Sequence, residues 1–95
     1  MGEIHTVVWQ RSVTKELDRL PFHVAKKSYA WVTAVKLAGL RAVRQTPGFH
    51  DEPLKGKRQG QRSVRLSRGY RAIYEERSQG EIELIEVVEV TLHEY

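Results

Sequence analysis

The sequence predicts an α+β domain in which helices pack on one face of a mostly antiparallel sheet. Two observations carry this prediction. Apolar residues in the first half recur at helical spacing after one short β-branched segment. The second half contains three segments with strand-like alternation, separated by turns rich in serine and glycine. The expected order is an N-terminal strand, two helices and a three-stranded antiparallel meander, within a single domain over residues 1–95.

A strand and a short helix are predicted at the beginning of the chain. Residues 4–9 are rich in β-branched and aromatic side chains, which favour a strand. Ser12 suits the N-cap of a helix that ends near Arg19, because its hydroxyl can accept a hydrogen bond from a backbone N–H of the first turn. The strand is therefore expected to lead almost directly into a helix.

A second, longer helix is predicted to begin at Pro21, whose fixed φ suits a first helical turn. The segment 46–48 (Thr-Pro-Gly) ends it, because proline disfavours helical geometry in the residue before it. Gly39 is a weak point inside this helix. One apolar face is expected, formed by Phe22, Ala25, Tyr29, Val32, Leu40 and Val43. The core or a helix interface is expected to contain Trp9, Tyr29 and Trp31.

The meander is predicted to follow a polar loop that runs from residue 49 to about residue 61. Its strands are expected at residues 63–67, 70–75 and 81–92, with turns at residues 67–69 and 78–80. In the second strand, alternation separates Arg71 and Ile73 from Tyr70, Ala72 and Tyr74. In the third, the alternation changes phase near Leu84 and Ile85, which predicts a bulge or burial on both faces.

The composition favours a cytoplasmic protein without a membrane partner. No cysteine is present, which excludes a disulfide framework and a zinc–thiolate site. Residues 1–9 lack the basic region and apolar run of a signal peptide. No stretch of about 18 apolar residues is long enough to cross a membrane.

The charge distribution favours a polyanionic partner. The net charge is +4, and lysine and arginine are concentrated between residues 55 and 77, where the only acidic residues are Glu75 and Glu76. Lysine and arginine bind phosphates favourably because they displace condensed counterions. A solvated basic loop without a partner is the alternative.

Four segments of the second half resemble the RelE/ParE toxin superfamily. They are Glu52-Pro53-Leu54-Lys55-Gly56, Arg65-Leu66, Gly69-Tyr70-Arg71-Ala72-Ile73-Tyr74 and the terminal His93-Glu94-Tyr95. The resemblance extends in element order over essentially the whole chain and is nearest to the RelE/YoeB-type mRNA interferases. Glu94 separates the histidine and tyrosine that are adjacent in the YoeB pattern, which puts the role of Tyr95 in doubt more than that of His93.

The resemblance implies the toxin of a type II toxin–antitoxin system, a ribosome-dependent endoribonuclease that cleaves translated mRNA. It implies three partners: a cognate antitoxin protein, the 70S ribosome with mRNA in its A site, and operator DNA only through the antitoxin complex. We expect no cofactor and no metal, since no cluster of His, Asp and Glu has ligand-like spacing. The alternatives are a ParE-like inhibitor of DNA gyrase and a catalytically inactive member that acts through binding.

Cleavage of RNA by its own 2′-hydroxyl needs a base, a cation beside the phosphate and an acid for the departing 5′-oxygen. Glu52 is the candidate base, and Pro53 holds it in an extended segment. Arg71 is the candidate cation, because its planar fork donates to two oxygens at once. His93 is the candidate acid, because histidine changes its charge nearest to neutral pH. Tyr95 is expected to stack on a base or contact the phosphate.

Each assignment has a structural alternative. Glu52 could balance nearby lysines, Arg71 could pair with a glutamate of the last strand, and His93 and Tyr95 could lie on a frayed end. Phosphate contacts of bound RNA are expected from Lys55, Lys57, Arg58, Arg62, Arg65 and Arg68, each of which could instead be a solvated charge.

Overall fold

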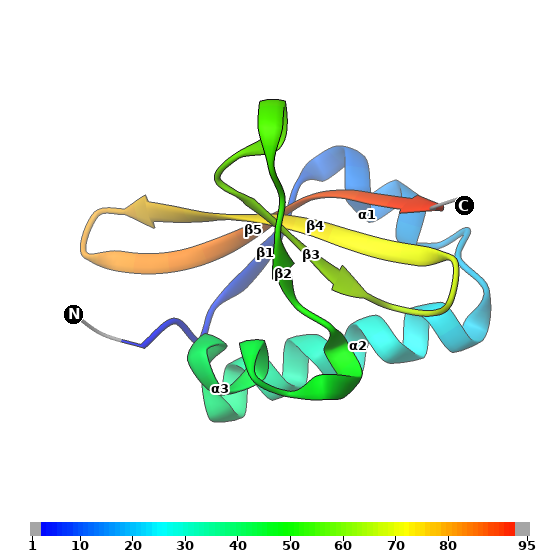
Figure 1. Ribbon diagram of the computed structural model, residues 1–95, viewed down its shortest axis with the longest axis horizontal. Helices are drawn as coiled ribbons and strands as arrows, with labels where there is room; N and C mark the ends of the chain where they lie inside the picture. The colour runs from blue at the N-terminus through cyan, green and yellow to red at the C-terminus, as the bar shows by residue number, and fades with distance from the viewer. Residues whose placement is uncertain (1–2, 93–95) are drawn as a thin grey trace.

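A five-stranded mixed sheet and three α-helices make up the computed structural model, which describes residues 3–92 (Figure 1). The helices are α1 (Arg11–Leu17), α2 (Phe22–Ala38) and α3 (Leu40–Arg44), with short 3-10 helices η1 (Pro47–Phe49) and η2 (Gly56–Arg58). The strands are β1 (Val7–Trp9), β2 (Glu52–Pro53), β3 (Gln61–Arg65), β4 (Tyr70–Gln79) and β5 (Ile82–Leu92). The predicted α+β class is confirmed.

The sheet has the strand order β1-β5-β4-β3-β2. Strands β3, β4 and β5 form the predicted antiparallel meander. Strand β1 pairs with β5 in parallel, with Val7 opposite Ile85 and Trp9 opposite Val87. This parallel pair makes the sheet mixed, and β1 is shorter than the predicted 4–9 segment.

The short strand β2 was not predicted. It lies within the expected polar loop and pairs Glu52 with Ser63 and Pro53 with Arg62. Two residues are too few to show an alternating pattern, so the sequence carries no strand signal here. Pro53 is compatible with this position because β2 is the edge strand of the sheet.

Two expected helix boundaries are wrong in detail. Gln10 occupies the N-cap of α1, so Ser12 lies inside the helix and does not cap it. Pro21 is the N-cap of α2 rather than part of its first turn. The second helix also does not continue to residue 45, because Gly39 adopts a φ of 90° and separates α2 from α3.

The predicted apolar face of the second helix is wrong both within α2 and across the break at Gly39. The side of α2 that is buried contains Val24, Ser28, Trp31 and Val35. Phe22 and Tyr29 are 81% and 64% exposed. Leu40 and Val43 are buried, but they belong to α3. Residues before and after Gly39 do not form one helical stripe, because the regular 3.6-residue spacing of side chains is interrupted at the break.

One apolar core lies between the helices and the sheet. Val13 of α1, Trp31 of α2 and Leu40 of α3 all belong to it, together with Ala72 and Tyr74 of β4. The rings of Trp31 and Tyr74 lie 5.6 Å apart. The expected burial of Trp31 is confirmed, and Trp9 packs against the core at its edge. Figure 1 shows α2 and α3 along one side of the sheet.

The predicted irregularity of β5 is confirmed. Burial on both faces and a bulge both occur, but at different residues of the strand. Leu84 and Ile85 are both buried, at 6% and 0% exposed. The ladder changes register further on: Ile73 lies opposite Glu89 and Tyr74 opposite Val87. Val88 is therefore the extra residue of a β-bulge.

Candidate active site

The sheet face opposite the core carries the predicted Glu52 and Arg71. Residues paired across neighbouring strands point to the same side of a sheet. The register places Glu52 opposite Ser63, Ser63 opposite Ile73, and Ile73 opposite Glu89. Four strands thus contribute side chains to one row on this open face.

A second row lies beside the first. Arg71 pairs with Arg65 on one side and with Thr91 on the other. Together the rows surround a cavity of about 350 Å³. It is lined by Glu52, Leu54, Arg58, Ser63, Arg71, Ile73, Glu89 and Thr91.

Glu52 and Arg71 meet in this cavity. Arg71 Nη1 lies 3.7 Å from Glu52 Oε1 and donates a hydrogen bond to Ser63 Oγ at 3.3 Å. The Arg71 side chain is 12% exposed, whereas that of Glu52 is 51% exposed. A largely buried guanidinium beside an accessible carboxylate is a suitable pair for binding a phosphate and accepting a proton next to it.

The residue before Glu52 is held by buried hydrogen bonds. The Asp51 side chain is fully buried and accepts hydrogen bonds from Arg62 Nε at 2.6 Å and from the Tyr74 hydroxyl at 2.7 Å. Arg44 Nε donates to the same hydroxyl at 3.2 Å. Burial raises the pKa of Tyr74 far above its ordinary value, so the hydroxyl keeps its proton and remains a donor to Asp51.

The six predicted RNA-binding cations do not form one group. Arg58 lines the cavity and forms an ion pair with Glu89. Arg62 pairs with the buried Asp51 and does not line the cavity. Lys55 and Lys57 are exposed on the loop around η2. Arg65 and Arg68 line a separate cavity at the other end of β3.

The predicted His93 and Tyr95 lie outside the described residues. The strand that precedes them ends at Leu92, one residue after the cavity-lining Thr91.

Several residues of the site were missed by sequence analysis. Ser63, Glu89 and Thr91 line the cavity, and Asp51 anchors the segment that carries Glu52. The alternation of β3 and β5 was the available signal for the first three, because it places them on the face of Arg71. No local pattern indicates Asp51, since its partners come from β3 and β4.

The structural alternative considered for Arg71 is realised by another arginine. Arg77, on the same face of β4, donates to Glu86 of β5 at 3.0 Å and to Glu75 at 2.5 Å. Arg71 lies beside Glu52 of β2, with Nη1 3.7 Å from Oε1. On this face, Arg77 is therefore paired with a glutamate of β5, whereas Arg71 lines the cavity.

No group of three His, Asp or Glu residues suited to holding a metal ion occurs within residues 3–92. In the same range, no helix is both long and apolar enough to cross a membrane.

Comparison with known proteins gives structural matches only. No protein-family model and no curated protein sequence matches the chain. A YoeB/ParE toxin from Agrobacterium tumefaciens matches with a TM-score of 0.66 at 23% identity, covering 94% of this chain and 99% of that one. The archaeal RelE of a RelE–RelB complex from Pyrococcus horikoshii matches at 0.66 and 20% identity, covering 92% of both chains.

A third match shows the same arrangement of elements. A YoeB–YefM complex from Staphylococcus aureus matches with a TM-score of 0.65 at 14% identity, covering 98% of this chain and all of that one. These identities are low, but the matches extend over nearly the whole of each chain. The chain therefore has the fold of the RelE/ParE toxin superfamily, as found in RelE and YoeB.

Proposed function

We propose that this protein is the toxin of a type II toxin–antitoxin pair and cleaves mRNA on the ribosome. The observation that carries the proposal is the meeting of Glu52 and Arg71, 3.7 Å apart, in a cavity on the open face of the sheet. The toxin fold supports it, because structures of RelE and YoeB share the arrangement of elements around this face.

The proposed reaction uses the 2′-hydroxyl of the RNA as its nucleophile. Glu52 accepts the proton of that hydroxyl while its oxygen attacks the adjacent phosphorus. Arg71 donates to the non-bridging oxygens, whose negative charge increases in the transition state. The bond from phosphorus to the 5′-oxygen breaks, and that oxygen receives a proton. The products are a 2′,3′-cyclic phosphate and a 5′-hydroxyl, and side chains alone supply the base, the cation and the acid.

The geometry of the pair suits entry of a phosphate. A separation of 3.7 Å exceeds the length of a normal N–H···O hydrogen bond. The pair is also open to solvent on the Glu52 side, where an ion pair adds little to stability. The contact between Arg71 and Glu52 is therefore a weak one.

His93 is proposed as the acid that protonates the 5′-oxygen, and Tyr95 as a contact to a base or phosphate. The support for His93 is its distance along the chain, since it follows the cavity-lining Thr91 by two residues. Cations around the cavity would hold the flanking phosphates.

The proposed partners follow from the same surface. The ribosome presents mRNA in its A site, and a cognate antitoxin would keep the toxin inactive. Two of the matching structures are named as complexes of RelE with RelB and of YoeB with YefM. Operator DNA would be bound only through the antitoxin complex, and the cytoplasm is the proposed location.

The test is a matched pair of substitutions on one strand. Arg71→Ala is expected to lower cleavage of translated mRNA by about 10²–10³-fold, the usual cost of removing a donor to a developing anion. Arg77→Ala removes an equal charge from the same face of β4, but outside the cavity, and should leave cleavage nearly unchanged. Mapping of mRNA 5′ ends after a pulse of expression measures both.

Two outcomes would contradict the proposal. Full cleavage by Arg71→Ala would remove this arginine from the mechanism. Inhibition of DNA gyrase supercoiling by the purified protein, with no new mRNA ends in cells, would instead assign the ParE-like activity to this fold.

A further inference from the structure

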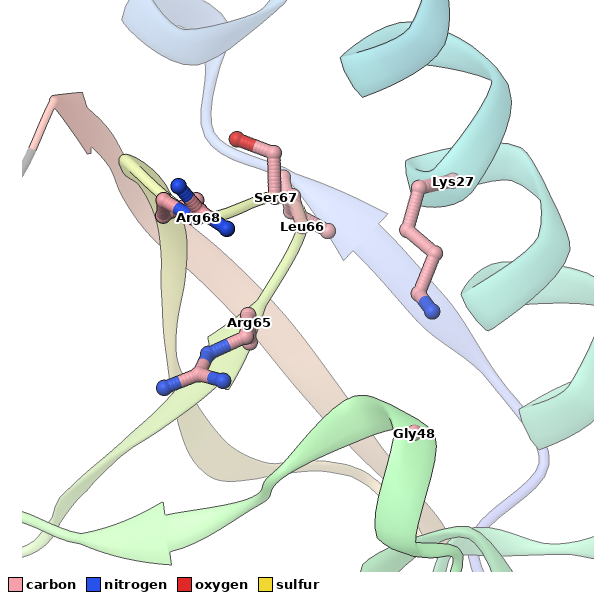
Figure 2. A pocket seen from close by; sticks show the side chains of 6 residues that line it. All are labelled: Lys27, Gly48, Arg65, Leu66, Ser67 and Arg68. Carbon is pink, nitrogen blue, oxygen red and sulfur yellow. The ribbon is translucent and has the colours of Figure 1, made fainter.

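A second cavity lies at the end of β3 that β2 does not cover. Its volume is about 380 Å³, and its walls come from α2, η1 and the turn between β3 and β4. It is lined by Lys27, Gly48, Arg65, Leu66, Ser67 and Arg68 (Figure 2). Three of the six lining residues are cationic and none is acidic.

Lys27 provides the wall that faces the β3–β4 turn. Figure 2 shows its side chain extending from α2 toward η1, across the gap from Arg65 and Arg68. Its Nζ lies 5.0 Å from the centre of the Phe49 ring, which holds the ammonium group at the cavity without neutralising its charge. Gly48 lies close to this ammonium group, since a Cβ atom at this position would be 3.8 Å from Nζ, an ordinary van der Waals contact.

Arg65 contributes an unsatisfied donor. Its Nε is buried and has no hydrogen-bond partner among the described residues. A buried guanidinium N–H without an acceptor is unfavourable, so a movement of the Arg65 side chain that brings an oxygen to it is favourable. The three cations, with no acidic residue in the lining, favour an anion with several oxygens, such as a phosphate group.

The two cavities are neighbours on the sheet. Arg65 lines the second cavity and is the direct cross-strand partner of Arg71, which lines the first. Directly paired residues have Cα atoms about 4.5–5.5 Å apart. Arg65 therefore connects the two cavities, because it lies beside Arg71 on the sheet and also lines the cavity of Lys27 and Arg68.

We propose that the Lys27–Arg65–Arg68 cavity binds a backbone phosphate of the RNA adjacent to the one held at Arg71. This inference rests on the proposed nuclease function and adds a contact from α2, a helix that sequence analysis assigned only to packing. The occupant is a phosphodiester rather than a protein carboxylate, because the cavity offers three cations and lies beside the reaction site.

NMR chemical shifts provide the test, since they report weak binding residue by residue in a protein of this size. The probe is a trinucleotide of 2′-O-methyl RNA, which lacks the nucleophile and is not cleaved. In the unaltered protein the amides of Gly48, Ser67 and Arg68 should shift together with those of Ser63 and Thr91. The Kd from both groups of signals should be the same.

Lys27→Ala and Lys26→Ala form the matched pair. Lys26 is the exposed neighbour on α2 and does not line the cavity. Lys27→Ala should weaken binding by about tenfold, the value of one charged hydrogen bond. It should also lower the slope of log Kd against log salt by about 0.7, one phosphate contact to single-stranded RNA. Lys26→Ala should change neither quantity, and Lys27→Arg should restore both.

The outcomes separate this inference from the proposed function. Shifts at Ser63 and Thr91 without shifts at Gly48 and Ser67 would overturn the second phosphate site and leave the nuclease proposal standing. Absence of all shifts at millimolar trinucleotide would count against both. If inorganic phosphate binds the second cavity as tightly as the trinucleotide, the site is one for a free anion and not for RNA.

Discussion

The face of the sheet that meets the helices and the face left open hold their side chains in different ways. On the covered face, Tyr74 and Ile85 are completely buried and packed in one cluster with Trp31. On the open face, Arg71 and Glu52 are positioned by strand register and by polar contacts. Alternation along one strand, β4, therefore separates Tyr74, which stabilises the fold, from Arg71, which is proposed to take part in the reaction.

The largest effect is expected on the covered face. Trp31→Ala should lower the free energy of unfolding by about 3–5 kcal/mol, because it removes a large buried side chain and leaves a cavity. Its Nε1 has no hydrogen-bond partner within the described part of the chain, so the loss is one of packing. Tyr29→Ala, on the exposed side of the same helix, should change stability by less than about 0.5 kcal/mol. Urea unfolding measures both, and equal losses would show that the assigned helix face is wrong.

A smaller effect should connect the two faces. Tyr74→Phe removes the hydroxyl that donates to buried Asp51 and accepts from Arg44, at an expected loss of about 1–2 kcal/mol of stability. Cleavage should fall as well, because Glu52 directly follows Asp51. The control is Tyr70→Phe on the same face of β4. If cleavage in Tyr74→Phe stays unchanged while stability falls, Asp51 does not position Glu52.

The smallest effect should appear at the start of α3, where Glu3 contacts the backbone of Arg41. Glu3 Oε1 accepts hydrogen bonds from the backbone N–H of Arg41 at 3.0 Å and of Ile4 at 3.1 Å. The Arg41 hydrogen bond is the main cause that lowers the pKa of Glu3 below its ordinary value of 4.5. A lowered carboxyl pKa stabilises the fold above pH 4.5, and this contribution disappears as the pH falls through the folded-state value.

Glu3→Gln tests this contact through its pH dependence. The unaltered protein should be more stable than the variant at pH 7, and the difference should shrink on acidification below pH 4.5. Urea unfolding of both proteins at pH 7 and pH 3 provides the measurement. A difference that grows toward acid would contradict the assigned role of Glu3.

The sequence predicted the fold best where short-range alternation decides the structure. The separation of Arg71 and Ile73 from Ala72 and Tyr74 is confirmed, because each side chain of a strand points opposite to its neighbour. The α2 face was predicted wrongly, because its buried stripe includes Ser28, whose hydroxyl donates to the Ala25 carbonyl, so burial does not follow apolar character along this helix.

The candidate site could be predicted only in part. Glu52 and Arg71 were named from the resemblance, and their meeting in one cavity supports that choice. The partners of Asp51 and the cavity beside Lys27 could not be predicted, because each joins segments far apart in the chain. Asp51 with Tyr74, and Lys27 with Arg68, become neighbours only when the sheet and helices have packed.

The extra residue at Val88 has a consequence for the shape of the open face. Ile73 and Glu89, on the two strands at the point where the register changes, both line the first cavity. An inserted residue bends its strand and increases local twist, and here it changes the phase of the alternation, so that Val87 faces the core and Glu89 faces the open side. We expect the resulting curvature to deepen the hollow on the open face. A relative with an uninterrupted β5 would present the same charges to RNA on a flatter surface.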